Sequence, residues 1–105
     1  MATRDIAGKT VQVNDEGFLT NSAEWTPEIA SALAAEEGIP ALTPDHWKVI
    51  DFCRKDAGAT GKSPTLRRIT TAAGVDTKQL FALFPKGPAK KVARISGLGK
   101  PEGCV

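Results

Sequence analysis

Three hydroxyl–proline pairs constrain where helices can begin in this sequence. In each pair the hydroxyl side chain can accept a hydrogen bond from a free backbone N–H of the first turn. Proline loses nothing at the first helical position, because its nitrogen would be unpaired there anyway. Apolar residues at helical spacing follow each pair. The pairs are Thr26-Pro27, Thr43-Pro44 and Ser63-Pro64, and they predict helices over about 27–37, 44–56 and 64–73.

Two further helices and a hairpin complete the predicted domain. Asp76 followed by Gln79 has the spacing of a capping box, which predicts a helix over about 77–84. The stretch "KGPAKKVARISG" predicts a short helix around Pro88–Val92. Ahead of all the helices, "KTVQVNDEGFLT" alternates apolar and polar residues around a glycine turn, which predicts a β-hairpin over about 9–13 and 17–20.

The end of the chain differs in composition from the rest. From Ser96 onward, three glycines and a proline disfavour regular structure. A length of 105 residues fits a single domain. We therefore expect residues 1–95 to form a mainly α-helical domain with an N-terminal hairpin, and residues 96–105 to form a mobile C-terminal arm.

Composition restricts the functional classes. No apolar run approaches the roughly 18 residues that cross a bilayer. The N-terminus has no apolar secretory segment, so we expect a cytoplasmic protein without a membrane partner. Two cysteines, Cys53 and Cys104, and one histidine do not have metal-ligand spacing, so no metal is expected. A reducing cytoplasm would keep both cysteines as thiols, although a disulfide between them is left open.

Several residues have a structural interpretation. Cys53 lies on the apolar stripe of its predicted helix, where cysteine behaves as a small hydrophobic residue. His46 lies in the first turn of the same helix and is interpreted as a polar surface residue. Trp25 and Trp47 are interpreted as core residues or, for Trp47, as the partner of Leu42 in a hydrophobic staple.

The segment from Leu66 to Leu83 has the spacing of a helix-turn-helix around a central glycine. Arg67, Arg68 and Lys78 could contact phosphates, so a helix-turn-helix DNA-binding regulator is an alternative function. Few side chains of the second helix can read base edges, however, and we expect no sequence-specific DNA binding.

Charge is distributed unevenly along the chain. Residues 1–53 hold three basic and nine acidic side chains, a net charge of −6, whereas residues 54–105 hold eleven basic and three acidic side chains, a net charge of +8. One interpretation is a solvated surface on both halves. The other is a basic surface that meets an anionic partner or favours a thiolate at Cys104.

Cys104, the penultimate residue, has no structural explanation. A thiol among glycines at the end of an arm has nothing to pack against and is open to oxidation. A tail of about nine residues reaches roughly 30 Å, so its sulfur could enter a pocket on a partner. The placement indicates thiol exchange or carriage of a sulfur atom as a persulfide. Lys100 would favour ionisation of the thiol, whereas the terminal carboxylate would oppose it.

Residues 84–105, "FPKGPAKKVARISGLGKPEGCV", resemble the signature of the DsrC/TusE family, which is F-P-x-G-P-A followed by G-L-P-K-P-x-G-C-V. The resemblance covers about Gly8 to Val105 and includes other elements in the family's order. It implies an orthogonal helical bundle with a β-hairpin and a C-terminal arm, and sulfur handling through Cys104. The other elements are "DEGFL", Trp25, "EEGI", "LTPDHWKVIDFCR" and "SPTLR".

Two positions depart from the family pattern. In DsrC proper the resemblance implies a second arm cysteine eleven positions before the terminal one, and this chain has Ala93 there. An intramolecular disulfide or trisulfide within the arm is therefore not expected, which is characteristic of the TusE-like members. Gly99 replaces a proline of the family pattern and should loosen the arm.

The resemblance implies a sulfur-relay protein that carries a persulfide on Cys104 without a metal or organic cofactor. Such a protein acts as a co-substrate rather than as a free-standing catalyst. Its partners would be an upstream persulfide donor protein and a downstream acceptor enzyme. The acceptor would be of the thiouridylase type, as in tRNA 2-thiouridine synthesis, or of the sulfite reductase type, or part of a sulfur-oxidation system. Gly97, Gly99 and Gly103 would give the arm its reach, and Arg94 and Lys100 would support the thiolate or persulfide anion.

Overall fold

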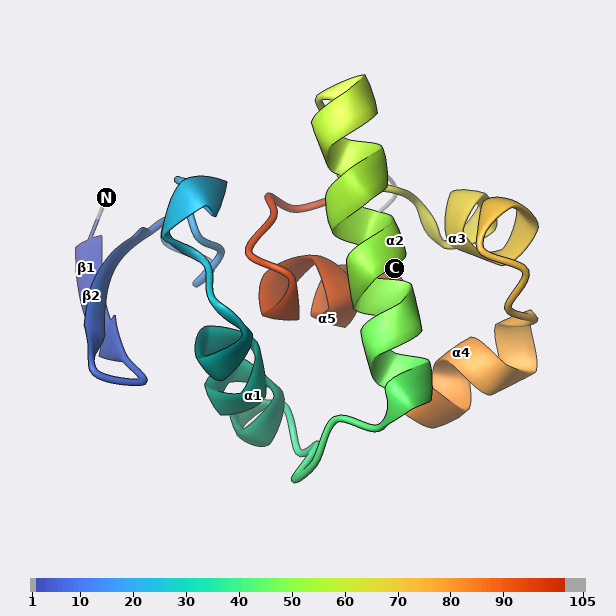
Figure 1. The fold of residues 1–105 in the computed structure, drawn as a ribbon, viewed down its shortest axis with the longest axis horizontal. Coiled ribbons are helices and arrows are strands. Elements are labelled where there is room, and N and C mark those ends of the chain that lie inside the picture. The colour runs from blue at the N-terminus through green and yellow to red at the C-terminus, as the bar shows by residue number, and fades with distance from the viewer. Residues whose placement is uncertain (1, 102–105) are drawn as a thin grey trace.

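The structure, a computed structural model, describes residues 2–101 and contains a two-stranded hairpin followed by a short 3-10 helix and five α-helices (Figure 1). The mainly α-helical bundle with an N-terminal hairpin that the sequence predicts is confirmed. No helix in the described part of the chain is long and apolar enough to cross a membrane. The elements are β1 (Ala2–Ile6), β2 (Lys9–Val13), η1 (Ser22–Glu24), α1 (Pro27–Glu36), α2 (Pro44–Thr60), α3 (Leu66–Ala72), α4 (Thr77–Leu83) and α5 (Pro88–Ile95).

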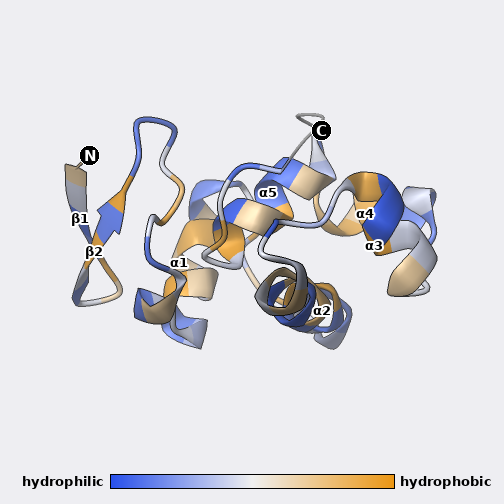
Figure 2. Ribbon diagram, turned by 90° about the horizontal axis from the view of Figure 1, so that it is seen from above, coloured by the Kyte–Doolittle hydropathy of each residue, from blue (hydrophilic) through white to orange (hydrophobic). Residues whose placement is uncertain are grey.

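The last helix, α5, lies in the middle of the molecule. It contacts α1, α2, α3 and α4, while the hairpin lies at one end of the long axis and α3 and α4 lie at the other (Figure 1). The helices that surround α5 carry both apolar and polar residues, as Figure 2 shows. Their buried apolar side chains form one continuous core with Val92 and Ile95 of α5. Residues that directly precede the C-terminal arm therefore belong to the centre of the fold.

The hairpin pairs different strands from those expected. Strand β2 matches the predicted strand over 9–13, but its antiparallel partner is β1, and the predicted strand over 17–20 contributes only an isolated bridge between Val13 and Leu19. The tight turn is Ala7-Gly8, with φ of 53° and 79°. Both residues are left-handed, as a two-residue hairpin of the primed type requires. Alanine rarely adopts this conformation, so the sequence does not predict a turn at this position.

Two of the three hydroxyl–proline pairs begin helices as predicted. Thr26 Oγ1 accepts a hydrogen bond from Ile29 N at 3.2 Å, and Thr43 caps α2 in the same way. The prediction at Ser63-Pro64 is wrong by two residues, because Thr65 Oγ1 accepts from Arg68 N at 3.2 Å and α3 begins at Leu66. The Ser63 hydroxyl donates instead to the carbonyl of Gly99, far along the chain, at 2.6 Å.

The interpretation of His46 as a surface residue is wrong. His46 is the third residue of α2, its side chain is buried, and its ring packs edge-to-face against Phe84. Backbone Thr43 N donates to Nδ1 at 3.0 Å, which completes a capping box with histidine in the position usually held by glutamate or glutamine. The imidazole thus satisfies a free donor of the helix start while it contributes to the core.

Helix α5 extends beyond its predicted end, to Ile95. It ends in a Schellman motif, in which Gly97 N donates to Arg94 O at 3.2 Å and Leu98 N donates to Ala93 O at 2.9 Å. Gly97 takes the left-handed conformation, with φ of 72°, that this motif needs. Leu98 is buried against the core. The motif turns the chain sharply where the arm begins.

Candidate functional site

Cys104 and Gly103, the residues to which the sequence assigns the sulfur chemistry and part of the arm's reach, lie outside the described residues. The structure describes the segment that precedes them, residues 96–101, which we call the arm root. Ser96, Gly97, Leu98 and Pro101 are buried, whereas Gly99 and Lys100 are exposed. The expected division between a domain over 1–95 and an arm over 96–105 remains a prediction.

Trp25 and Arg54 contact the beginning of the arm root. Trp25 Nε1 donates to the Ile95 carbonyl at 2.8 Å, and Arg54 Nη1 donates to the Ser96 carbonyl at 2.7 Å. These carbonyls belong to the last turn of α5, where oxygen atoms lack helical partners and a positive charge is favourable. The Arg54 guanidinium also stacks on the Trp25 ring, 4.1 Å from its centroid. The two side chains together cap the helix from which the arm leaves.

Gly97 lies directly against Trp25. A Cβ at position 97 would be 2.6 Å from Trp25 Cδ1 and 2.7 Å from Trp25 Cβ. Only a residue without a side chain allows this approach. Gly99, by contrast, has open space where a Cβ would be placed, and its φ is not left-handed. The two described arm glycines are therefore not equivalent, since Gly97 is required for close packing and Gly99 is not.

Two further contacts reach the exposed part of the arm root. The Ser63 hydroxyl donates to Gly99 O at 2.6 Å, from the connection between α2 and α3. Lys100 Nζ lies 3.1 Å from a carboxylate oxygen of Glu16, in the loop after β2. The arm root is therefore bound by two loops. Lys100, which the sequence suggests as support for a thiolate, forms an ion pair here, and its role toward sulfur remains a prediction.

A cleft of about 650 Å³ opens beside the arm root. One wall is the arm itself, a second is the outer face of α2 with Arg54, Ala57 and Gly58, and a third is the loop after β2. The small residues on α2 leave room beside the backbone of residues 97–99. Arg54 places a cation at this cleft, and burial lowers its pKa from the ordinary value without removing its charge at neutral pH.

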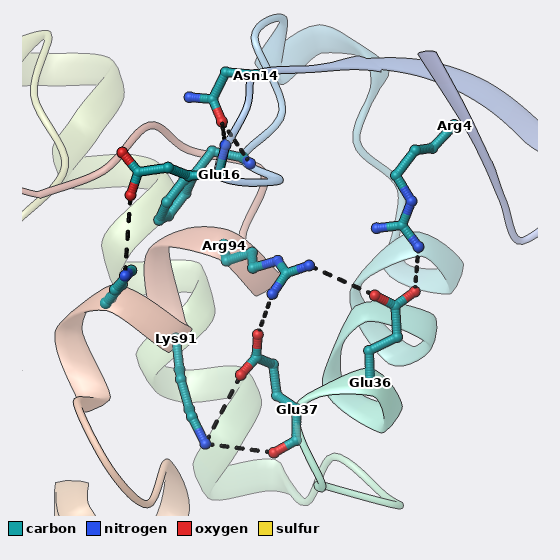
Figure 3. Close-up of polar contacts among 9 residues, drawn as sticks. Arg4, Asn14, Glu16, Glu36, Glu37, Lys91 and Arg94 are labelled. Atoms are coloured by element: carbon teal, nitrogen blue, oxygen red, sulfur yellow. Dashed lines mark hydrogen bonds and ion pairs between the residues drawn. The ribbon is translucent and has the colours of Figure 1, made fainter. Parts of the chain in front are cut away.

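Arg94 belongs to an ion-pair network between α1 and α5, which Figure 3 shows. Its guanidinium binds Glu37, lies 3.6 Å from Glu36, and packs over Gly17. Glu36 also binds Arg4 of the hairpin at 2.7 Å, and Glu37 binds Lys91 at 3.8 Å. Ion pairs from Arg94 and Lys91 to Glu36 and Glu37 thus join the basic half of the sequence to the acidic half at a partly exposed surface. The suggested support of a thiolate by Arg94 remains a prediction, and the contacts described are structural.

The thiol of Cys53 is sequestered. Its side chain is buried on α2, as the sequence predicts, and burial raises the pKa of this thiol far above its ordinary 9.0, with the Asp56 carboxylate adding to the effect. Such a thiol is a poor nucleophile at neutral pH. Ala93, where the family pattern of DsrC proper has cysteine, is buried on α5. Position 93 has no sulfur atom, and the sulfur atom of Cys53 is unreactive.

The helix-turn-helix spacing corresponds to α3 and α4, and its basic residues serve different purposes. Arg67, Arg68 and Lys78 are all exposed, but Arg68 also donates to the buried carboxylate of Asp56 at 2.8 Å. One of the three expected phosphate contacts is thus committed to an ion pair with α2. Among residues 2–101, no group of three histidine, cysteine or acidic side chains is arranged to hold a metal ion.

Sequence reasoning missed Arg54 and Ser63 as contacts of the arm, and treated Trp25 only as a core residue. Their partners lie 42, 36 and 70 residues away along the chain. No local pattern encodes such pairings. The one available signal is Arg54 itself, a charged residue directly after buried Cys53 on α2, where a partner for the guanidinium is to be expected.

Comparison with known proteins gives a consistent result. Residues 5–105 match the family model described as DsrC like protein. The chain is 37% identical, over all of both chains, to the dissimilatory-type sulfite reductase subunit gamma of Nitratidesulfovibrio vulgaris (strain Hildenborough). It is 36% identical to the sulfurtransferase TusE of Escherichia coli (strain K12), covering 93% of this chain and 95% of the relative.

Solved structures agree with this result. The crystal structure of dissimilatory sulfite reductase I (DsrI) contains a chain that is 37% identical, with a TM-score of 0.87 over 99% of this chain and 100% of that one. The NMR structure of Allochromatium vinosum DsrC is also 37% identical, with a TM-score of 0.85 over 98% of this chain and 97% of that one.

Proposed function

This chain belongs to the family of DsrC-like proteins, and from that membership we propose that it is a sulfur carrier, which holds a persulfide on Cys104 and delivers the outer sulfur atom to a partner enzyme. Its relatives include a protein named as a sulfurtransferase and one named as a sulfite reductase subunit. The observation that carries the proposal is the sequestration of Cys53, because it leaves Cys104 as the chain's remaining thiol.

The proposed loading step is a thiol–persulfide exchange. The Cys104 thiolate attacks the outer sulfur of a donor persulfide, R–S–SH, and the S–S bond of the donor breaks. The donor leaves as the thiolate RS⁻, and Cys104 becomes Cys104–S–SH. No external oxidant or reductant is needed, because a sulfur atom moves between two thiols. Delivery repeats the same exchange, with Cys104 as the leaving thiolate and the acceptor enzyme as the nucleophile.

The acceptor that we propose is a tRNA-modifying enzyme that forms 2-thiouridine, as the resemblance to the TusE-like members implies. Ala93 supports this choice, because the arm has one thiol and cannot close a disulfide on itself to release a product. The alternative acceptor is a dissimilatory sulfite reductase or a sulfur-oxidation system. The full-length similarity to the sulfite reductase subunit gamma favours that alternative.

Intact-mass measurement tests the carrier proposal. After incubation with glutathione persulfide, wild-type protein should gain ~32 Da, the mass of one sulfur atom. The Cys104→Ser variant should not gain this mass, whereas Cys53→Ala should load like the wild type because its missing thiol is buried. Loading that persists in Cys104→Ser would overturn the proposal. Adding a purified thiouridylase or sulfite reductase to the loaded protein then distinguishes the acceptors by which of them removes the extra mass.

A further inference from the structure

We propose that Trp25 and Arg54 are positioning residues that hold the arm root against the body, so that Cys104 is tethered by the residues beyond Pro101 and not by the whole arm. The inference deepens the proposed function, on which its meaning for sulfur transfer rests. It concerns where the thiol is presented and from which point the chain pivots.

The first support is the way in which α5 ends. The Schellman motif satisfies two backbone donors of the arm, Gly97 N and Leu98 N. The carbonyls of Ile95 and Ser96 are satisfied by Trp25 and Arg54 from other parts of the chain. A backbone with donors and acceptors paired on both sides does not pivot without losing these bonds.

The second support is that the two side chains stabilise each other. Stacking on Trp25 fixes the orientation of the planar Arg54 guanidinium. In this orientation Nη1 donates to Ser96 O, and Nη2 donates to Ser22 O at 3.4 Å. Trp25 in turn lies under Gly97 in close contact. Arginine is suited to this role, because its flat guanidinium can lie on the indole ring while its separate N–H groups reach two carbonyls. The pair therefore acts as one clamp on the arm root.

The third support is that the contacts continue to the end of the described chain. Ser63 binds Gly99 and Glu16 binds Lys100, and Pro101 is buried. The pivot is thereby moved from Ile95 to Pro101. Cys104 is three residues beyond Pro101 but nine beyond Ile95, so its reach falls from roughly 30 Å to roughly 10 Å. A partner must accordingly bring its sulfur atom to the loops that flank the arm root, residues 14–20 and 60–64.

A nitroxide attached to Cys104 measures this directly. Cys53 is buried and should not react, so native protein can be labelled at one site without further mutation. Paramagnetic broadening of backbone amide signals then maps where the label resides. In wild-type protein we expect broadening concentrated at the arm root and at residues 14–20 and 60–64. In Arg54→Ala and in Trp25→Phe, which lacks the Nε1 donor, we expect loss of this pattern and weak broadening spread over several faces, including α4.

The matched control is Arg4→Ala, which removes another ion-paired arginine, bound to Glu36 on α1 and away from the arm root. It should keep the wild-type pattern. If Arg54→Ala does not fold, Arg54→Lys takes its place, with the same loss of the wild-type pattern expected. Wild-type broadening in both the Arg54 and Trp25 variants would overturn the proposal, as would spread broadening in the wild type. Persulfide loading of the wild type is scored separately, so failure to load rejects the carrier function while the amide map still decides the positioning role.

Discussion

His46 Nε2 donates a hydrogen bond of 2.9 Å to the carbonyl oxygen of Leu83 and so joins the first turn of α2 to the last residue of α4. Nδ1 of the same ring accepts from Thr43 N at 3.0 Å, so each ring nitrogen has a backbone partner at a different helix end. One side chain therefore serves two helix ends, a free donor of α2 and a free acceptor of α4.

Replacing His46 with alanine should destabilise the fold. Thr43 N and Leu83 O would both lose their partner in a partly buried setting, which costs roughly 1–3 kcal/mol in the free energy of unfolding. Lys48→Ala, an exposed change in the next turn of α2, serves as the control and should stay within about 0.5 kcal/mol of wild type. Urea unfolding followed by circular dichroism measures both. Equal stability of the two variants would show that the histidine contacts contribute nothing.

Gly97→Ala and Gly99→Ala should differ, although both glycines belong to the arm. At position 97 the left-handed backbone alone costs about 1–2 kcal/mol, and the new Cβ would also collide with Trp25. At position 99 there is open space and no left-handed strain, so the change should be nearly neutral. Thermal unfolding of the two variants compares these effects. A Gly97→Ala melting temperature as high as that of Gly99→Ala would contradict the packing of Trp25 under the arm.

Stability should fall at alkaline pH through Cys53. Burial raises the pKa of this thiol in the folded protein, so above the ordinary thiol pKa of 9.0 the unfolded chain loses a proton that the folded chain retains. The folded state then binds more protons than the unfolded state, and the free energy of unfolding falls by up to about 1.4 kcal/mol per pH unit. The advantage of Cys53 over Cys53→Ala, measured in the Cys104→Ser background, should shrink between pH 8 and pH 10.5. Parallel stability curves would show that the thiol ionises freely in the folded protein.

Restoring a thiol at position 93 should permit an internal disulfide that the wild type does not form. The closed loop between residues 93 and 104 is short, so its entropic cost is modest. Ala93 is buried on α5, however, and the arm root is bound beside it, so closure of Ala93→Cys should be slow. Adding Arg54→Ala should speed closure by releasing the arm root. Non-reducing mass spectrometry after mild oxidation follows the bond, and a double variant that closes no faster than Ala93→Cys would argue against the clamp.

Sequence-specific binding to duplex DNA should be absent at physiological salt. All three candidate phosphate contacts are exposed, but Arg68 is paired with Asp56, so Arg67 and Lys78 remain for phosphate. Two phosphate contacts give weak binding that salt screens. A gel shift with a defined operator that is lost in the Arg67→Ala/Lys78→Ala double variant would refute this prediction.

Local signals account for most of the secondary structure that the sequence predicts. The caps at Thr26, Thr43 and Asp76 lie where expected, because a side-chain cap and its backbone donor are only three residues apart. The sequence predicts the wrong partner for strand β2 because Asn14–Gly17 contains favourable turn residues. That turn does form, with Asn14 Oδ1 accepting from Glu16 N and Phe18 N as Figure 3 partly shows, but it is followed by a single bridge.

In the candidate site, too, features that depend on local sequence can be predicted and features that depend on tertiary contacts cannot. Cys104 can be identified from its position and from the family pattern, both of which are properties of the sequence alone. The clamp on the arm root cannot, because Trp25 precedes α1 and Arg54 lies on α2, and the two become neighbours only where both segments meet the end of α5. Ser63 shows the same effect, since a hydroxyl that suits a helix cap binds the distant Gly99 instead while Thr65 caps α3. A hydroxyl that could cap a nearby helix can instead bind a distant carbonyl, and only the folded structure shows which partner it takes.

The central position of α5 links the stability of the domain to the behaviour of the arm. The helix fills the middle of the core, contacts α1, α2, α3 and α4, and ends at Ile95, directly before the arm root. Local opening of the fold around α5 therefore also frees the residues that lead to Cys104. A substitution in the core can for this reason change the handling of sulfur without touching the thiol.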